Sequence, residues 1–268
     1  MTESKVYKPI LIVAAFLFLT LFLVLPLLII FIGAFSQGFY VFWYSITEPA
    51  ARHAIFLTII VLIITVPLHT LFGLTAAWAL TKFRFRGRQF IITLIEIPFA
   101  ISPVIAGLIF IILYGVNGFF GEWLIDNDLQ VIFALPGIIL ATMFVTLPFI
   151  ARELIPLMEA QGTDAEEASI TLGAGGFRTF YHVTFPAIKW GLLYGVILCS
   201  ARAIGEFGAV SVVSGRIRGA TNTMPLHVEI LYNEYQFASA FSIALLMSLF
   251  AIFTIIIKQI VERKQHLR

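Results

Sequence analysis

The most informative feature of this 268-residue sequence is how little charge it carries. Only 12% of its residues are Asp, Glu, Lys or Arg, whereas about 25% is typical of a soluble domain. The net charge of +2 is too small for a protein that binds the phosphate backbone of nucleic acids, so no nucleic-acid partner is expected. With a single cysteine, Cys199, the chain cannot form an internal disulfide or a multi-cysteine metal site.

Apolar residues are abundant instead: they make up 60% of the chain, and the mean hydropathy is +1.00. A helix needs roughly 20 apolar residues to cross a bilayer. Stretches of that kind predict membrane spans near 10–35, 54–80, 90–115, 131–150, 190–213 and 237–257. These stretches are apolar on every side, whereas barrel strands would alternate. In the third one, Pro98 and Pro103 remove backbone donors and are expected to kink the helix. The predicted fold class is an all-α integral membrane protein with six transmembrane helices.

The distribution of basic residues predicts the orientation in the membrane. The first stretch is longer than the apolar core of a cleaved signal peptide, so we treat it as a retained helix. If the N-terminus is inside, thirteen of the seventeen Lys and Arg residues fall on the cytoplasmic side and three outside, with Arg202 in a span. Cytoplasmic loops are enriched in Lys and Arg, so both termini are expected in the cytoplasm of a cell with this chain in its inner (plasma) membrane.

A short helix is predicted at 163–173, in the internal loop between the fourth and fifth spans. Thr163 is expected to cap its N-terminus, with Glu166 reaching back to complete a capping box. Gly173 supplies the left-handed residue that ends the helix. The small residues Ala168 and Ser169 would allow a partner to approach closely. The alternative is a solvated connector, which is the usual reading of such an acidic helix.

The same loop carries a spaced motif of four parts: Glu167-Ala168-Ser169, Gly173, a gap of nine residues, and Val183-Thr184-Phe185-Pro186. It resembles the E-A-A, three residues, G, nine residues, I-x-L-P signature of ABC-importer permeases, with three mild departures. The resemblance implies a type I importer permease core in residues 51–258. Residues 1–50 would then form a tail, the first helix and an outer loop, and 259–268 a cytoplasmic tail.

The resemblance also implies that 163–173 is a coupling helix, bound in a groove of a cytoplasmic ATPase subunit that is present in two copies. The residues implied in this contact are Thr163, Glu166, Glu167, Ala168, Ser169, Leu172, Gly173 and Pro186. The chain lacks a Gly-x4-Gly-Lys-Ser/Thr loop, so it cannot bind ATP in that way itself. ATP and Mg²⁺ are therefore expected on the ATPase, and no cofactor in this chain. An intramembrane enzyme would need paired aspartates, a Ser/His dyad or a His-Glu-x-x-His zinc site, and no span contains one.

Two charges lie within the fifth stretch, Arg202 and Glu206, four residues apart on one helix face. Each costs about 2.5–3.5 kcal/mol at mid-membrane on insertion scales, so the pair must face the protein interior or a wet cavity. Two interpretations stay open. The pair is a mutual salt bridge that fixes helix packing, or Arg202 lies on the path of an anion with Glu206 as its resting counter-ion. Gly205 and Gly208 are expected to allow close packing or a bend there.

Residues 205–235 resemble the W-type permeases of sulfate/thiosulfate importers, and related molybdate permeases share the Gly-Glu-Phe-Gly segment at 205–208. The resemblance implies a permease subunit of an ATP-driven sulfate/thiosulfate importer. It further implies a second permease of the T/U type and an external sulfate-binding protein. The alternatives are a molybdate or tungstate permease, which could be a homodimer, and a passive anion channel or secondary carrier.

The outer segment that follows the fifth stretch begins with two arginines and continues into a predicted helix. Arg216 and Arg218 are expected to contribute to docking of the binding protein or to guide the anion inward. Thr223 is the candidate cap of the helix, and Leu226, Ile230 and Leu231 are expected on the membrane surface. The alternative is an ordinary interfacial helix with no role in transport.

Overall fold

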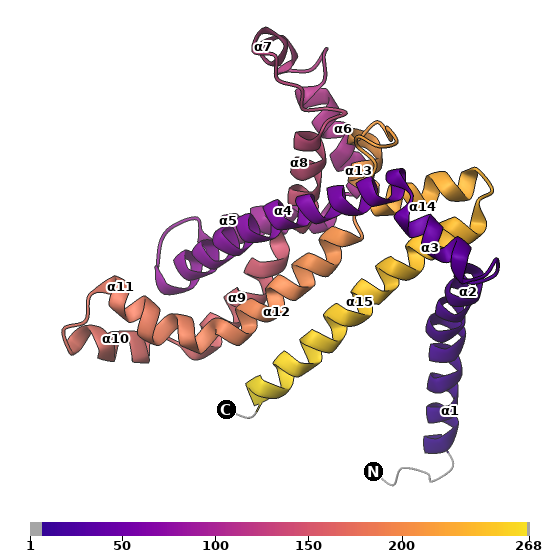
Figure 1. The fold of residues 1–268 in the computed structure, drawn as a ribbon. Helices are drawn as coiled ribbons and strands as arrows, with labels where there is room; N and C mark the ends of the chain where they lie inside the picture. The colour runs from indigo at the N-terminus through magenta and orange to yellow at the C-terminus, as the bar shows by residue number, and fades with distance from the viewer. Residues whose placement is uncertain (1–6, 267–268) are drawn as a thin grey trace.

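The structure, a computed structural model, describes residues 7–266, and all regular elements in that range are helical. Residues 1–6 and 267–268 of the two predicted tails lie outside the described residues. The last helix, α15 (Phe237–His266), continues through most of the stretch at 259–268 that was predicted as a tail. Figure 1 shows the long helices lying at different angles, the N-terminal one steeper than the others, with shorter helices toward both ends of the bundle.

Five continuous segments are long and apolar enough to span a membrane, which accounts for five of the six predicted spans. They are Lys8–Ala34, Pro49–Lys82, Leu135–Gln161, Gly176–Ile204 and Phe237–Ile260. The first contains α1 (Tyr7–Leu19), the π-helical turn η1 (Thr20–Val24) and α2 (Leu25–Ala34). The second is α4 (Pro49–Lys82), and the third is α8 (Leu135–Thr146) followed by α9 (Pro148–Gln161).

The remaining predicted span, at 90–115, is broken into α5 (Arg88–Ala100) and α6 (Pro103–Tyr114), which meet at an angle of 105°. Ser102 has an extended backbone (ψ 132°), as expected for a residue that precedes a proline, and Pro103 then opens α6. The kink predicted at Pro103 is confirmed, whereas Pro98 lies within the continuous helix α5. The pair counts as a sixth span if the two helices are taken together.

The fifth span was predicted at 190–213, and both of its ends were wrong. It starts earlier, with α11 (Gly176–Thr179) and the π-helical turn η2 (Phe180–Thr184), and its main helix α12 (Phe185–Ile204) ends before Gly205. A separate helix, α13 (Gly208–Val213), follows, so the predicted bend is confirmed. Hydropathy alone cannot detect this break, because the residues on both sides of it are equally apolar.

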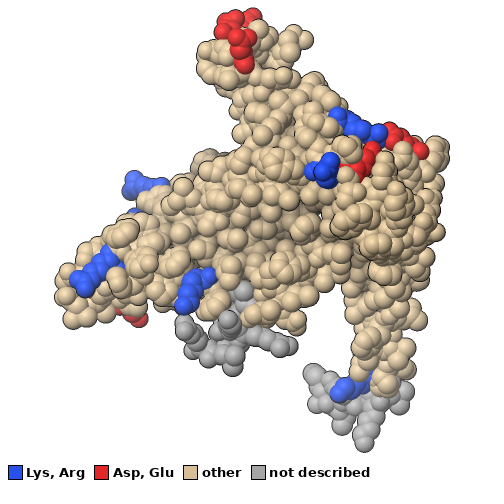
Figure 2. Space-filling model, viewed as in Figure 1, with Lys and Arg blue, Asp and Glu red and all other residues tan. Residues whose placement is uncertain are grey.

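Among the described residues, four short helices besides α13 lie outside the spans: α3 (Phe39–Thr47), α7 (Gly121–Asp126), α10 (Asp164–Thr171) and α14 (Met224–Asn233). In Figure 1, α10 lies at one end of the bundle, and α7, α13 and α14 lie toward the other. Figure 2 shows a broad uncharged band between charged side chains near the two ends on the face in view. This is the surface that a protein surrounded by lipid requires.

The core is built around α4, which contributes to all three buried clusters. One cluster joins α4 to α9 and α12 through side chains such as Leu154 and Ile188. The other two hold together the end of the bundle that carries α14 and include Leu226 and Leu231. The most apolar part of the first span has no buried residue, and in Figure 1 α1 stands apart from the bundle.

Candidate functional site

The predicted coupling helix exists as α10, but its N-terminal contacts differ from the predicted capping box. The Thr163 hydroxyl donates to Glu167 Oε1 (2.7 Å) rather than bonding a backbone N–H. Glu166 turns away from the helix start, because Lys82 Nζ lies 2.8 Å from its Oε1. A charge-assisted hydrogen bond of this kind is stronger than one to a neutral amide. Burial acts to raise the pKa of Glu166, but hydrogen bonds from Lys82, a backbone amide and Thr184, together with the Lys82 charge, lower it overall.

The C-terminal end of α10 matches the prediction for Gly173, which is in the left-handed region with φ +89°. The Gly173 N–H donates to the carbonyl of Ile170 (2.9 Å), and the Ala174 N–H donates to that of Ser169 (3.1 Å). These two bonds form a Schellman motif, which satisfies the last carbonyls of the helix. The Ser169 and Thr179 hydroxyls are 3.1 Å apart, so α10 is tied to α11.

No residue of α10 is buried, and several apolar side chains beside it project into open space. Leu172 is 88% exposed and Phe177 is 84% exposed. Ala168 and Glu167 are also exposed, and so is Pro186 in the first turn of α12. An exposed apolar patch of this kind is typical of a surface that another protein covers. The role of these residues in ATPase contact stays a prediction.

Arg202 and Glu206 form the ion pair that one of the two interpretations predicts, with Nη1 and Oε2 2.6 Å apart. The Glu206 side chain is 1% exposed and that of Arg202 is 32% exposed. The other Glu206 oxygen accepts the backbone N–H of Ala209 (2.9 Å), so the same carboxylate caps the start of α13. A Cβ added to Gly208 would lie 2.8 Å from that of Pro103, so α13 and α6 pack closely. The path of an anion past Arg202 stays a prediction.

Arg216 and Arg218 contact acidic residues of the same chain, Glu229 of α14 and Glu234 directly after it. Arg216 Nη1 lies 3.3 Å from Glu229 Oε1, and Arg218 Nη2 lies 2.7 Å from Glu234 Oε2. In this conformation the positive charges are largely neutralised inside the outer segment. Their contribution to docking or anion guidance stays a prediction, and it would require these pairs to open or to act together with their acids.

The predicted helix of the outer segment exists as α14, but its apolar side chains do not face the membrane surface. Leu226 and Leu231 are 0% and 2% exposed and belong to the core. Thr223 precedes the helix without a side-chain cap, and Thr58 of α4 accepts the Met224 N–H instead (3.0 Å). The expected surface position was wrong, because the segment folds back onto α4 and α15 instead of lying along lipid.

One buried polar group of α14 was not anticipated from the sequence. His227 is 1% exposed, and its Nδ1 lies 3.1 Å from the Asn222 amide. Burial, together with the nearby Arg218 charge, lowers the pKa of His227 to about 4, so the ring is neutral at pH 7. A buried, neutral and hydrogen-bonded histidine holds the outer segment in one conformation.

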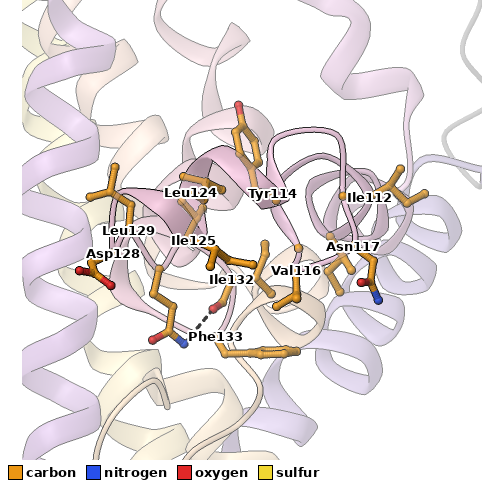
Figure 3. Close-up of a pocket in the computed structure, with 16 residues that line it drawn as sticks. Ile112, Tyr114, Val116, Asn117, Leu124, Ile125, Asp128, Leu129, Ile132 and Phe133 are labelled. Carbon is orange, nitrogen blue, oxygen red and sulfur yellow. Dashed lines mark hydrogen bonds between the residues drawn. The ribbon is translucent and has the colours of Figure 1, made fainter.

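A cavity of about 790 Å³ lies between α6, α7 and the loop at 128–133. Figure 3 shows mainly apolar side chains around it, including Tyr114, Leu124, Ile132 and Phe133, with Asp128 at one side. Nothing in the motifs pointed to this cavity. Among residues 7–266, no three His, Cys, Asp or Glu side chains lie close enough together to bind a metal ion.

The comparison with known protein families agrees with this architecture. Residues 69–266 match the model of the family described as "Binding-protein-dependent transport system inner membrane component". The chain belongs to this family. It is therefore a multi-pass inner-membrane permease subunit of an ABC importer, and members of this family are not themselves catalytic.

Two relatives illustrate the similarity within this permease family. The "Sulfate transport system permease protein CysW" of Escherichia coli (strain K12) is 48% identical over 240 residues, which cover 90% of this chain and 82% of that protein. The "Sulfate transport system permease protein CysT" of the same strain is 36% identical over 242 residues, which cover 89% and 87% of the two chains.

A solved structure supports the fold independently of these sequences. It is a bacterial alginate ABC transporter in complex with an alginate pentasaccharide-bound periplasmic protein. The match has a TM-score of 0.75 and covers 95% of this chain and 92% of that one, at 16% identity. At this identity the similarity concerns the fold alone. The shared fold is that of an ABC-importer permease.

Proposed function

We propose that this permease is the W-type subunit of an ATP-driven importer of sulfate and thiosulfate. The observation that carries the cargo assignment is the 48% identity to a sulfate permease over 90% of the chain. The resemblance of residues 205–235 to the same class supports it. Because the similarity extends over nearly the whole chain, it includes the spans that would line the path of the anion.

Besides the lipid bilayer, the proposed importer gives this chain three kinds of partner. Two ATPase subunits bind ATP and Mg²⁺, and one of them contacts α10. A second permease of the T/U type completes a heterodimer, a proposal supported by the 36% identity to a CysT protein, since the two permease types are related to each other. An external binding protein delivers the anion. The exposed, apolar surface around α10 is the feature of this chain that supports the ATPase contact.

The membrane orientation follows from the same proposal. If α10 contacts a cytoplasmic ATPase, then the end of the bundle that carries α10 is cytoplasmic, and α7, α13 and α14 are external. In Figure 1 the start of α1 and the end of α15 lie toward the lower side of the bundle, away from α7. Both termini are then cytoplasmic, in agreement with the excess of basic residues predicted on that side.

The proposed mechanism requires no covalent chemistry in this chain. ATP binding brings the two ATPase subunits together, the coupling helices move with them, and the permeases open toward the outside. Hydrolysis reverses the motion. Each state favours different contacts, so the bound nucleotide shifts the equilibrium between them. A path for a dianion should offer modest positive charge without holding the ion tightly. Arg202, held by Glu206 beside the break at Gly205, fits that requirement.

The experiment that tests this function is uptake of labelled sulfate by membrane vesicles that contain the chain and the subunits encoded beside it. We expect uptake to require internal ATP and to be reduced at least tenfold by excess thiosulfate. Stronger competition by molybdate than by thiosulfate would change the cargo to the alternative oxyanion. Uptake that is equally fast without ATP would contradict an ATP-driven importer and favour a passive channel or a secondary carrier.

A further inference from the structure

Lys82 is the last residue of α4, and its contacts join three elements of the cytoplasmic end. Its Nζ lies 2.8 Å from Glu166 Oε1 and donates to the Gly162 carbonyl at 2.5 Å. The Thr184 hydroxyl, at the end of η2, donates to the same Glu166 oxygen at 3.1 Å. One carboxylate of α10 therefore contacts both the end of α4 and the turn that leads into α12.

This contact differs from an ordinary surface ion pair in its burial. The side chains of Lys82 and Glu166 are only 9% and 17% exposed. The ion pair of Arg88 and Glu159 on the same end of the bundle is much more open, at 37% and 48%. Exposed pairs contribute little because water and salt screen them, whereas shielded pairs with additional hydrogen bonds hold one geometry.

Few other contacts fix α10 to the membrane spans. Within the described part of the chain, its other side-chain hydrogen bond to a neighbouring element joins Ser169 to Thr179 of α11. No residue of α10 is fully buried, and the helix packs against α11 and η2 rather than against α4. A displacement of α10 can therefore reach α4 mainly through Glu166.

We propose that Lys82, Glu166 and Thr184 form a transmission clamp, in which Lys82 is the positioning residue that passes movement of α10 to the span α4. The clamp rests on the proposed function, because α10 transmits movement only if an ATPase subunit binds it. The lowered pKa of Glu166 keeps its carboxylate ionised at neutral pH, so the clamp is formed under working conditions. Since α4 contributes to all three core clusters, its movement reaches both ends of the molecule.

The test uses the whole importer in proteoliposomes, with sulfate uptake and ATP hydrolysis measured in the same vesicles. Lys82→Met and Glu166→Gln each remove one charge and keep the side-chain size. We expect the ATPase to copurify with both variants, and the ratio of sulfate imported to ATP hydrolysed to fall at least fivefold. The double variant Lys82→Glu, Glu166→Lys restores the pair in the opposite sense and should return the ratio to within twofold of the wild type.

Arg88→Met is the matched control, because it breaks an ion pair on the same end of the bundle that does not involve α10. The ratio of sulfate imported to ATP hydrolysed should remain that of the wild type in this variant. The clamp is overturned if Lys82→Met and Glu166→Gln keep the wild-type ratio, or if the charge-reversed pair assembles without restoring it. The clamp is also overturned if the ATPase fails to copurify with Lys82→Met and Glu166→Gln, since Lys82 and Glu166 would then act in docking of the ATPase.

A second measurement is independent of the cargo. Amide hydrogen exchange of the purified chain in lipid nanodiscs should be at least fivefold faster across 163–173 in Lys82→Met than in the wild type, and unchanged in Arg88→Met. Unchanged exchange in Lys82→Met contradicts the clamp even if the anion proves not to be sulfate. Absence of ATP-dependent sulfate uptake by the wild type contradicts the proposed function alone.

Discussion

The segment at 162–186, which is predicted to be cytoplasmic, and the outer segment at 205–236, which is predicted to be external, carry similar sequence signals but fold in opposite ways. Each contains a short helix preceded by threonine, charged residues and a few large apolar side chains. The helix α10 has no buried residue, whereas α14 buries four, including Leu226 and His227. Arg216 and Arg218 pair with acidic residues of their own segment, whereas Leu172 and Phe177 beside α10 are exposed.

The surface of α14 is therefore already covered by other parts of this chain, whereas the surface around α10 is not. Side chains of α14 find their partners in α4 and α15, so the outer segment is part of the core of this chain. The apolar side chains beside α10 have no such partner among the described residues. A partner protein therefore gains more by covering α10 than by covering α14. Four predictions test this contrast.

The largest effect is expected at the start of the outer segment. Glu206→Ala removes the partner of Arg202 and the cap of α13, and leaves a charge within the membrane. Breaking a buried pair on one side costs about 3–5 kcal/mol, so the thermal midpoint in detergent should fall strongly. The double variant Arg202→Ala, Glu206→Ala should recover part of the loss. An unchanged midpoint in Glu206→Ala would contradict a structural role of the pair.

The sharpest comparison uses the same substitution in both segments. Leu226→Ala removes a fully buried side chain and should lower the free energy of unfolding by about 2–5 kcal/mol. Leu172→Ala removes an 88% exposed side chain, which should change stability by less than about 0.5 kcal/mol. The second variant should instead weaken copurification of the ATPase. The contrast fails if Leu172→Ala destabilises the chain as much as Leu226→Ala does.

An intermediate effect is expected at the end of α10. Gly173→Val places a branched side chain at φ +89°, a strain of about 1–2 kcal/mol. If the shape of α10 is required for the ATPase contact, recovery of the ATPase in a pull-down should fall about tenfold. Gly175→Ala is the control, because Gly175 has an ordinary φ and open space around it. Equal recovery with both variants would remove the coupling role from this end of α10.

The smallest effect is expected at the outer arginines. Arg218→Gln breaks one exposed ion pair with Glu234, so the free energy of unfolding should change by no more than about 1 kcal/mol. If the arginine serves only this pair, the concentration of binding protein that half-saturates uptake should stay the same. A rise of more than fivefold would assign Arg218 to docking, in spite of its partner in this chain.

The sequence alone was sufficient for the features that depend on composition and on local backbone chemistry. The fold class, the kink at Pro103, the end of α10 at Gly173 and the pairing of Arg202 with Glu206 all follow from apolar length, missing donors, positive φ and charge spacing. Long-range contacts could not be predicted in this way. Glu166 satisfies the pattern of a capping box, but Lys82, far away in the sequence, attracts its carboxylate more strongly.

The prediction for the outer segment was wrong for the same reason. An amphipathic helix beside a membrane has the same pattern whether its apolar side faces lipid or α4 and α15. The positions of Leu226 and Leu231 are therefore decided by the path of the chain after the break at Gly205. The start of the fifth span was missed because α11 and η2 are more polar than the rest of it. Only the packing of the whole bundle defines these boundaries.

The most direct test of the central claim is the accessibility of one introduced thiol. Cys199 is buried, so Ala168→Cys provides an accessible cysteine on α10. We expect a maleimide to label it rapidly in the isolated permease and at least tenfold more slowly once the ATPase subunits are bound. Tyr235→Cys, at an 81% exposed outer position, should label equally in both cases. Undiminished labelling of Ala168→Cys in the assembled importer would contradict the claim that the ATPase binds α10.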